Sequence, residues 1–407
     1  MLAAHRLFPY AAMRTSYRDI ALLACCQGLL LVNTSGLTAM SGLVGYALVA
    51  DKTYATLALT TYVIGSACAA MPASLWMAKV GRRRGFMTGA GFGMAGIATC
   101  ALALWRHDFA LYCIGTAMSG VYTAFGLQYR FAAAEVAAPA FRSRAISLVL
   151  AGGVAGGFLG PATSNLAKDL LPVHFLGSFV VLIAMALLAL AVQSRVDVPA
   201  PAPVERGSGR PLFEIMRQPV FIVAALSAAL SYGVMNLLMA ATPLAMSFCG
   251  HPYSAVALVF EWHIVGMYAP GFITGSLIAR FGALRVIAAG ATLMGLCIAI
   301  ALSGVEVWQF WAALLLLGVG WNFMYTGGTT LLTESYAPGE RAKTQGVNDF
   351  LIFAVMGVSS FSAGALVNAA GWQAMNAGSL PVVLAVVLAV AWLAWRRRAA
   401  VSAAQAS

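Results

Sequence analysis

Charge is scarce in this chain of 407 residues, of which only 9% are Asp, Glu, Lys or Arg. A soluble domain carries roughly a quarter of its residues as charged side chains, so this chain cannot cover itself with a water-compatible surface. By contrast, 61% of the residues are hydrophobic. They form long continuous runs instead of an alternation of period two, which favours membrane-spanning helices over a transmembrane barrel.

Several motifs of catalytic and metal-binding proteins are also missing. The 7 cysteines include no CxxC pair, so we interpret them as small buried core residues and expect neither a metal nor a cofactor. The chain contains no GxxxxGK[ST] segment, the motif expected of an ATP-driven motor. It also contains no HExxH segment or paired-acid motif that would indicate an enzyme. The chain has a net charge of +11, and its basic residues lie between the hydrophobic runs. This placement indicates orientation in a membrane and not a nucleic-acid partner.

Apolar windows bounded by charges and turn residues predict twelve membrane-spanning helices. If the N-terminus is cytoplasmic, 21 of the 24 Lys and Arg residues fall on the cytoplasmic side, and only Lys52, Arg106 and Lys168 fall outside. The positive-inside rule therefore predicts a multi-pass protein of a bacterial-type inner membrane, with both termini in the cytoplasm and the lipid bilayer as its main partner. We expect a monomer. The predicted spans are 20–49, 55–78, 86–104, 109–130, 146–167, 173–193, 219–247, 254–279, 286–303, 308–333, 345–369 and 377–395.

A linker divides the chain in two. The segment VDVPAPAPVERGSGRP is rich in Pro, Gly and charge, a composition typical of linkers. It predicts an N-terminal six-helix bundle over 1–193, a cytoplasmic linker over 194–218 and a C-terminal six-helix bundle over 219–407.

Two loops repeat between these halves at nearly the same offset, which indicates a duplicated six-helix unit. In the first loop a basic residue, a spacer and a glycine recur; in the second, an acid, a proline and two bases keep their spacing. Such basic loops can form ion pairs that hold one conformation of a transporter closed. The candidate gate residues are Lys79, Gly81, Arg82, Arg83, Glu135, Arg142 and Arg144 in the first half, and Gly275, Arg280, Gly282, Arg285, Glu334, Arg341 and Lys343 in the second.

At these residues the chain resembles the major facilitator superfamily (MFS). Lys79, Gly81, Arg82 and Arg83 match the second half of that family's GxLaDRxGRR loop, although Ala78 stands at its acidic position. The resemblance implies an all-α membrane protein with twelve transmembrane helices in two pseudo-symmetric six-helix bundles. The fifth predicted helix is similar to the family's antiporter signature through Gly156, Gly160 and Pro161. The same glycines could serve close helix packing alone.

Ionisable side chains inside the predicted spans are few and are therefore candidates for function. Glu261 and His263 lie in the eighth span, and being two residues apart they point to different faces of a helix. Each could carry a proton, or could be hydrated near the outer surface. Asp349 lies near the start of the eleventh span, where pairing with a cytoplasmic arginine or capping of the backbone is the favoured interpretation over proton coupling.

The resembled fold places its solute between the halves, bordered by the first, fourth, seventh and tenth helices. Aromatic and amide side chains there favour a small neutral or aromatic solute. The leading hypothesis is secondary transport by alternating access, with proton-coupled efflux slightly preferred to proton-coupled uptake of a nutrient or vitamin. A membrane-embedded enzyme or a non-transporting sensor is a weaker alternative. The candidate solute residues are Asn33, Thr34, Tyr122, Gln128, Tyr232, Asn236, Trp321, Asn322 and Tyr325.

Overall fold

The structure is a computed structural model that describes residues 16–138, 141–198, 209–337 and 340–406, without some side chains that flank the gaps. Within these ranges the regular elements are helices, and no strand is found. The elements of the N-terminal half are α1 (Tyr17–Leu48), η1 (Lys52–Tyr54), α2 (Leu57–Val80), α3 (Arg82–Arg106), α4 (Phe109–Gly126), α5 (Tyr129–Glu135), α6 (Arg142–Ala167) and α7 (Leu176–Gln193). The remaining elements are α8 (Leu212–Met216), α9 (Pro219–Phe248), α10 (Tyr253–Tyr268), α11 (Gly271–Phe281), α12 (Ala283–Ser303), α13 (Val307–Leu332), η3 (Thr333–Ser335) and α14 (Arg341–Ala406).

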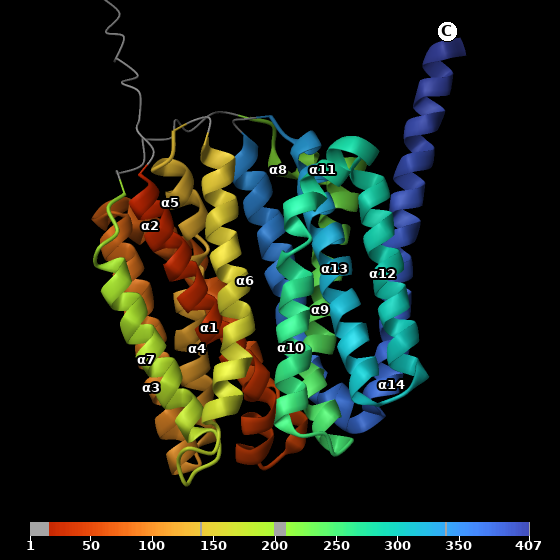
Figure 1. The fold of residues 1–407 in the computed structure, drawn as a ribbon. Coiled ribbons are helices and arrows are strands. Elements are labelled where there is room, and N and C mark those ends of the chain that lie inside the picture. Colours follow the sequence, from red (N-terminus) through yellow and green to blue (C-terminus); the bar gives the residue numbers. More distant parts are fainter. Residues whose placement is uncertain (1–15, 139–140, 199–208, 338–339, 407) are drawn as a thin grey trace, which may run out of the picture.

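The helices lie side by side as a bundle, with the N-terminal half (α1–α7) and the C-terminal half (α9–α14) next to each other (Figure 1). Equivalent helix pairs pack in both halves. α1 packs on α6 as α9 packs on α14, and α3 and α2 pack on α4 as α12 and α10 pack on α13. This matching pattern is the three-dimensional counterpart of the repeat in the sequence.

Ten helical stretches of the described chain are long and apolar enough to cross a membrane. One of them, Lys343–Ala399, has 57 residues. At about 1.5 Å per residue it is far longer than the roughly 30 Å thickness of a bilayer core and must cross it twice. The predicted spans 345–369 and 377–395 are thus merged into α14, which is interrupted at Gly371 (φ 79°). The 26-residue α6 is not among the ten but lies in the bundle with the other long helices.

Glycine sets the tight turn between consecutive helices at the same place in each half. Gly81 separates α2 from α3 with φ 84° and ψ 163°, and Gly282 separates α11 from α12 with φ 83° and ψ 153°. Residues with a side chain rarely adopt a positive φ, so both loops need glycine. Two predicted spans are also interrupted: the fourth is divided into α4 and α5, and the eighth into α10 and α11.

The two ends of the bundle differ. The described parts of the linker and the end of α14 lie at one end, called here the linker end; η1 and the α9–α10 turn lie at the opposite end (Figure 1). Lys52 lies in η1, Arg106 ends α3 and Lys168 follows α6, so these three cations lie at the opposite end, where η1 is found and where α3 and α6 end.

The expectation that the cysteines are core residues is only partly right. Cys26, Cys100 and Cys297 are buried, but Cys25, Cys68 and Cys249 are exposed. Because the membrane accepts apolar side chains on the outside of the bundle, an apolar sequence context does not by itself indicate a buried position.

Candidate functional site

Aromatic side chains from three helices of the C-terminal half meet near the middle of the bundle. The rings of Trp321 and Tyr325 on α13 are stacked, with centroids 5.1 Å apart and planes 9° from parallel. The ring of Tyr232 on α9 stands edge-on to both, at 5.0 Å and 5.4 Å. Tyr268, the last residue of α10, lies within electrostatic range of Tyr232 and Tyr325. The sequence therefore predicted three of these four residues as solute candidates.

The N-terminal half contributes a tyrosine opposite this group. The Tyr62 hydroxyl on α2 donates to Thr34 Oγ1 at 3.4 Å and lies 2.6 Å from Thr123 Oγ1. Tyr62 is within electrostatic range of Tyr232, and Tyr268 packs against the hydrophobic core of the N-terminal half. Tyr62, Tyr232, Tyr268, Trp321 and Tyr325 are called here the central aromatic cluster.

One cation and one anion flank the cluster from opposite halves. Arg130, at the start of α5, is exposed and lies within electrostatic range of Tyr232, Tyr325 and Asp349. Asp349 on α14 is also exposed, and its carboxylate accepts a long 3.5 Å hydrogen bond from Asn348. Asp349 thus lies within electrostatic range of an arginine that belongs to the other half of the molecule.

The other predicted solute residues form bonds within one half. Asn33 donates to the Leu29 carbonyl of its own helix at 3.0 Å, and Tyr122 is buried against Gly93 of α3. Gln128 accepts from Arg82. The amides of Asn236 and Asn322 join helices of the C-terminal half: Asn236 donates to the Met356 carbonyl at 3.1 Å, and Asn322 donates to the Met267 carbonyl at 2.8 Å and accepts from Thr274 at 2.7 Å.

Asn322 has an identifiable task in that position. α10 ends at Tyr268, and α11 begins after Pro270, which has no backbone N–H. A break of this kind leaves carbonyl groups without helical partners. The Asn322 side chain forms hydrogen bonds both to the Met267 carbonyl of α10 and to Thr274 in the first turn of α11. It therefore connects the two parts of the broken helix.

The two ionisable residues of α10 have different surroundings. His263 is fully buried, and its Nδ1 donates to the Leu314 carbonyl of α13 at 2.7 Å, within the C-terminal half. Glu261 is 8% exposed, and within the described part of the chain it forms no hydrogen bond or ion pair. The structure therefore gives His263 a helix-bridging contact through Nδ1, while its Nε2 is buried without a hydrogen-bond partner among the described residues. Glu261 is a nearly buried residue whose carboxylate also has no partner there.

The gate residues of the first half form a compact ion pair. Arg82 donates to both carboxylate oxygens of Glu135, at 3.1 Å and 2.6 Å, and to Gln128 Oε1 at 3.3 Å. The side chain of Arg82 is only 10% exposed. This pair ties the start of α3 to the end of α5, so the linker end of the N-terminal half is held by its own residues.

The second half does not repeat this pair, because the position equivalent to Arg82 is Ala283. Glu334, the equivalent of Glu135, accepts instead from Arg397 on the extension of α14, at 2.6 Å. Lys79, Arg83, Gly275, Arg280 and Arg285 are exposed. The side chains of Arg142, Arg144 and Arg341 lie outside the described part of the structure.

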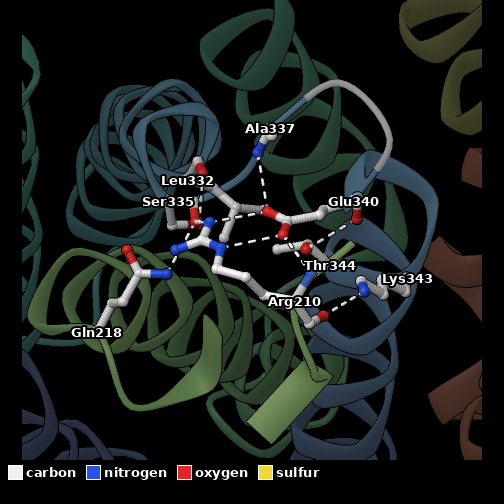
Figure 2. Close-up of polar contacts among 8 residues, drawn as sticks. All are labelled: Arg210, Gln218, Leu332, Ser335, Ala337, Glu340, Lys343 and Thr344. Carbon is white, nitrogen blue, oxygen red and sulfur yellow. Dashed lines mark hydrogen bonds and ion pairs between the residues drawn. The ribbon is translucent and has the colours of Figure 1, made fainter. Parts of the chain in front are cut away.

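A clasp between the linker and the α13–α14 loop is the densest group of polar contacts at this end (Figure 2). Arg210 donates from Nε and Nη2 to the carboxylate of Glu340, at 2.9 Å and 2.7 Å, and from Nη2 to the Ser335 carbonyl at 3.1 Å. The backbone amides of Arg210 and Ala337 also donate to Glu340, and Lys343 donates to the Arg210 carbonyl. The Arg210 guanidinium and the Ala337 amide lower the pKa of Glu340 to about 2. The carboxylate therefore stays charged at any physiological pH.

The glycines of the predicted fifth helix lie against α1. A Cβ at Gly156 would stand 1.9 Å from the Gly28 carbonyl oxygen, and one at Gly160 would stand 2.1 Å from Ser35 Oγ. Small residues allow this backbone approach. Close packing of α6 on α1 therefore accounts for the glycines, and Pro161 continues the same helix.

Three residues of this site were missed from the sequence. Tyr62 and Tyr268 lie on helices that were not considered as solute-lining, and Arg130, the last residue of the predicted span 109–130, was counted only as a cytoplasmic cation. The signal that could have found Tyr268 is the Pro270 two residues later, since a broken membrane helix often marks a binding site.

Two matching helix bundles with aromatic, hydroxyl and charged side chains between them indicate a membrane transporter. A family model described as Major Facilitator Superfamily matches residues 23–269 and 224–406. The chain belongs to this superfamily, whose members are transporters and not enzymes.

Similar proteins agree with this assignment. The riboflavin transporter RfnT of Brucella anthropi is 37% identical over 376 residues, which cover 91% of this chain and 94% of that one. The uncharacterised MFS-type transporter YdeG of Bacillus subtilis is 28% identical over 87% of this chain and 86% of its own. Among solved structures, the nucleoside transporter NupG matches 91% of this chain and 98% of its own with a TM-score of 0.74 at 11% identity. That last likeness concerns the fold.

Proposed function

We propose that this transporter takes up a flat aromatic vitamin of the riboflavin type and binds it at the central aromatic cluster. Riboflavin combines a planar fused ring system with a chain of hydroxyl groups. The stacked pair Trp321–Tyr325 offers a flat surface to such a ring. The hydroxyls of Tyr62, Thr34 and Thr123 offer hydrogen bonds to the chain. The observation that carries the proposal is this cluster, in a chain 37% identical to a riboflavin transporter.

The charges near the cluster suit the same solute. A phosphorylated flavin would need several cations, and the site presents Arg130 together with the anion Asp349. Together these two charges are neutral, which favours an uncharged solute with polar edges. Export of the solute in exchange for protons would run in the direction opposite to the proposed uptake. The sequence supported export only through the glycine pattern of α6, and close packing on α1 accounts for those glycines.

Glu261 is the proposed proton carrier. A carboxylate that is nearly buried and has no partner in the described structure is costly when charged, so binding and release of a proton is a natural role for it. We also propose that the linker end faces the cytoplasm, because the three outside cations Lys52, Arg106 and Lys168 lie on elements of the opposite end. In this proposal the two halves move as bodies within a monomer.

The test is uptake of radiolabelled riboflavin by proteoliposomes with an imposed proton gradient. Trp321→Ala should raise the KM about two- to tenfold, because one aromatic contact is worth roughly 0.5–1.5 kcal/mol. Trp308→Ala is the matched control, since Trp308 is 59% exposed at the opposite end. Glu261→Gln should remove the response to the gradient. If wild-type vesicles carry no riboflavin in either direction, the proposed solute is wrong.

A further inference from the structure

Thr56 joins the two halves of the molecule through an unusual contact at the opposite end. Its hydroxyl donates to the Ser360 carbonyl of α14 at 2.9 Å and accepts from the Gly364 amide of α14 at 2.9 Å. Thr56 and Ser360 are both fully buried. Ser360 and Gly364 are four residues apart, so they are the two groups that an undisturbed α-helix joins to each other. A side chain of one half thus enters the backbone ladder of a helix of the other half.

The same hydroxyl has an obvious alternative partner in its own half. Thr56 is the N-cap residue of α2, yet its side chain makes no capping bond to that helix. Threonine at an N-cap usually accepts a hydrogen bond from an amide of the first helical turn. The capping position on α2 is therefore available to Thr56 whenever α14 moves away.

The neighbouring contacts are built for this close approach. A Cβ at Gly364 would stand 2.8 Å from Thr56 Oγ1 and 3.1 Å from the Thr56 amide nitrogen. Asn368, one turn further along α14, donates to the Lys52 carbonyl at 3.0 Å. Between fully described residues, these are the hydrogen bonds that join the two halves, and all lie at the opposite end.

We propose that the Thr56 hydroxyl is a two-position switch that latches the opposite end of the transporter closed. In the closed position it bridges Ser360 and Gly364. When the halves part, Thr56 turns to cap α2, and the Gly364 amide returns to the Ser360 carbonyl. The backbone groups of Ser360 and Gly364 are paired in both positions, so the latch stabilises the closed state without preventing the halves from separating. The inference rests on the proposed alternating access and is independent of which solute is carried.

The test measures the separation of the halves directly. Spin labels are attached at Ala110→Cys on α4 and Ser303→Cys on α12, two exposed positions at the opposite end, in a version without the native cysteines. Pulsed dipolar spectroscopy then gives the distance distribution in nanodiscs. Thr56→Val keeps the shape but loses the hydroxyl. It should raise the ratio of separated to closed molecules roughly three- to tenfold, as expected for lost hydrogen bonds.

Two matched controls separate the hydroxyl from general packing. Thr56→Ser keeps the hydroxyl and should restore the wild-type distribution. Thr60→Val removes a neighbouring hydroxyl that bonds only to its own helix, at the Thr56 carbonyl, and should leave the distribution unchanged. A wild-type distribution in Thr56→Val, or an equal shift in Thr56→Ser, would overturn the proposal.

Gly364→Ala provides a second route if Thr56→Val fails to fold. The added methyl collides with Thr56, so it should also favour separated halves, whereas Gly357→Ala on the same helix enters open space and should not. Equal distributions for the two alanine variants would refute the latch. Because the readout is a distance, a failed riboflavin assay with a shifted distribution would reject the solute and keep the switch.

Discussion

The contact between α1 and α6 makes the stability of this transporter depend on single glycines. At Gly156 an added Cβ would meet the Gly28 carbonyl oxygen at 1.9 Å, whereas ordinary contact begins at 3.4 Å. The two backbones must therefore separate by about 1.5 Å to admit Gly156→Ala. Overpacking of this kind costs about 1–3 kcal/mol, and a backbone carbonyl cannot rotate away as a side chain can.

Gly153 is the matched control on the same helix. A Cβ there would meet only the flexible side chain of Gln27, at 3.2 Å. Gly153→Ala should therefore be neutral or stabilising by up to ~1 kcal/mol, the gain in helix propensity. Thermal unfolding of the purified protein in detergent should place the midpoint of Gly156→Ala roughly 2–12 °C below that of Gly153→Ala. Equal midpoints would show that the helices are not held at this distance.

Three further changes test the linker end and the broken helix. Arg82→Gln should lower the unfolding free energy by about 1–3 kcal/mol, because it leaves the half-buried Glu135 without its cation; the double change Arg82→Glu with Glu135→Arg should recover part of the loss, and no recovery would refute the pair. Glu340→Gln should lower the thermal midpoint by a constant amount from pH 5 to 8. The folded-state pKa of Glu340 is about 2 and its ordinary value is 4.5, so the difference in thermal midpoint between wild type and Glu340→Gln should shrink only as the pH falls below about 4.5. A midpoint difference that changes between pH 6 and 8 would show that the lost stability does not come from the charged carboxylate. Asn322→Leu should destabilise the protein by about 1–3 kcal/mol in the same assay, because the Met267 carbonyl loses its partner. Asn368→Leu, at an exposed position of α14 close to its interruption at Gly371, should cost less.

The parts of the fold that the sequence predicted depend on local chemistry. Gly81 and Gly282 both have a positive φ because they occupy equivalent tight turns in the two halves. The repeat in the sequence follows from that requirement. Tyr232, Trp321 and Tyr325 could be chosen because they are mid-span aromatic residues on the helices that the resembled fold places around its solute. Neither inference needs knowledge of distant contacts.

The residues that were assigned differently depend on partners far away in the sequence. Asn236 and Asn322 are as polar as any solute-binding amide, but each meets a carbonyl freed or presented by another helix. His263 likewise bonds the Leu314 carbonyl. In a membrane an amide or imidazole satisfies the nearest backbone group unless water or solute competes, and only tertiary structure shows which case applies.

The duplicated halves are fastened at the linker end by different means, and this asymmetry has a physical consequence. In the N-terminal half, Arg82 and Glu135 join two neighbouring helices directly. In the C-terminal half the cation is lost at Ala283, and the α13–α14 loop is fixed by Arg397 from the end of α14 and by Arg210 from the linker. The linker from Arg210 onward is therefore attached to the C-terminal half and should move with it. At the start of the linker, the backbone amide of Asp197 donates to the Asp19 carboxylate of α1 at 3.0 Å, so this part of the linker is attached to the N-terminal half and should move with that half.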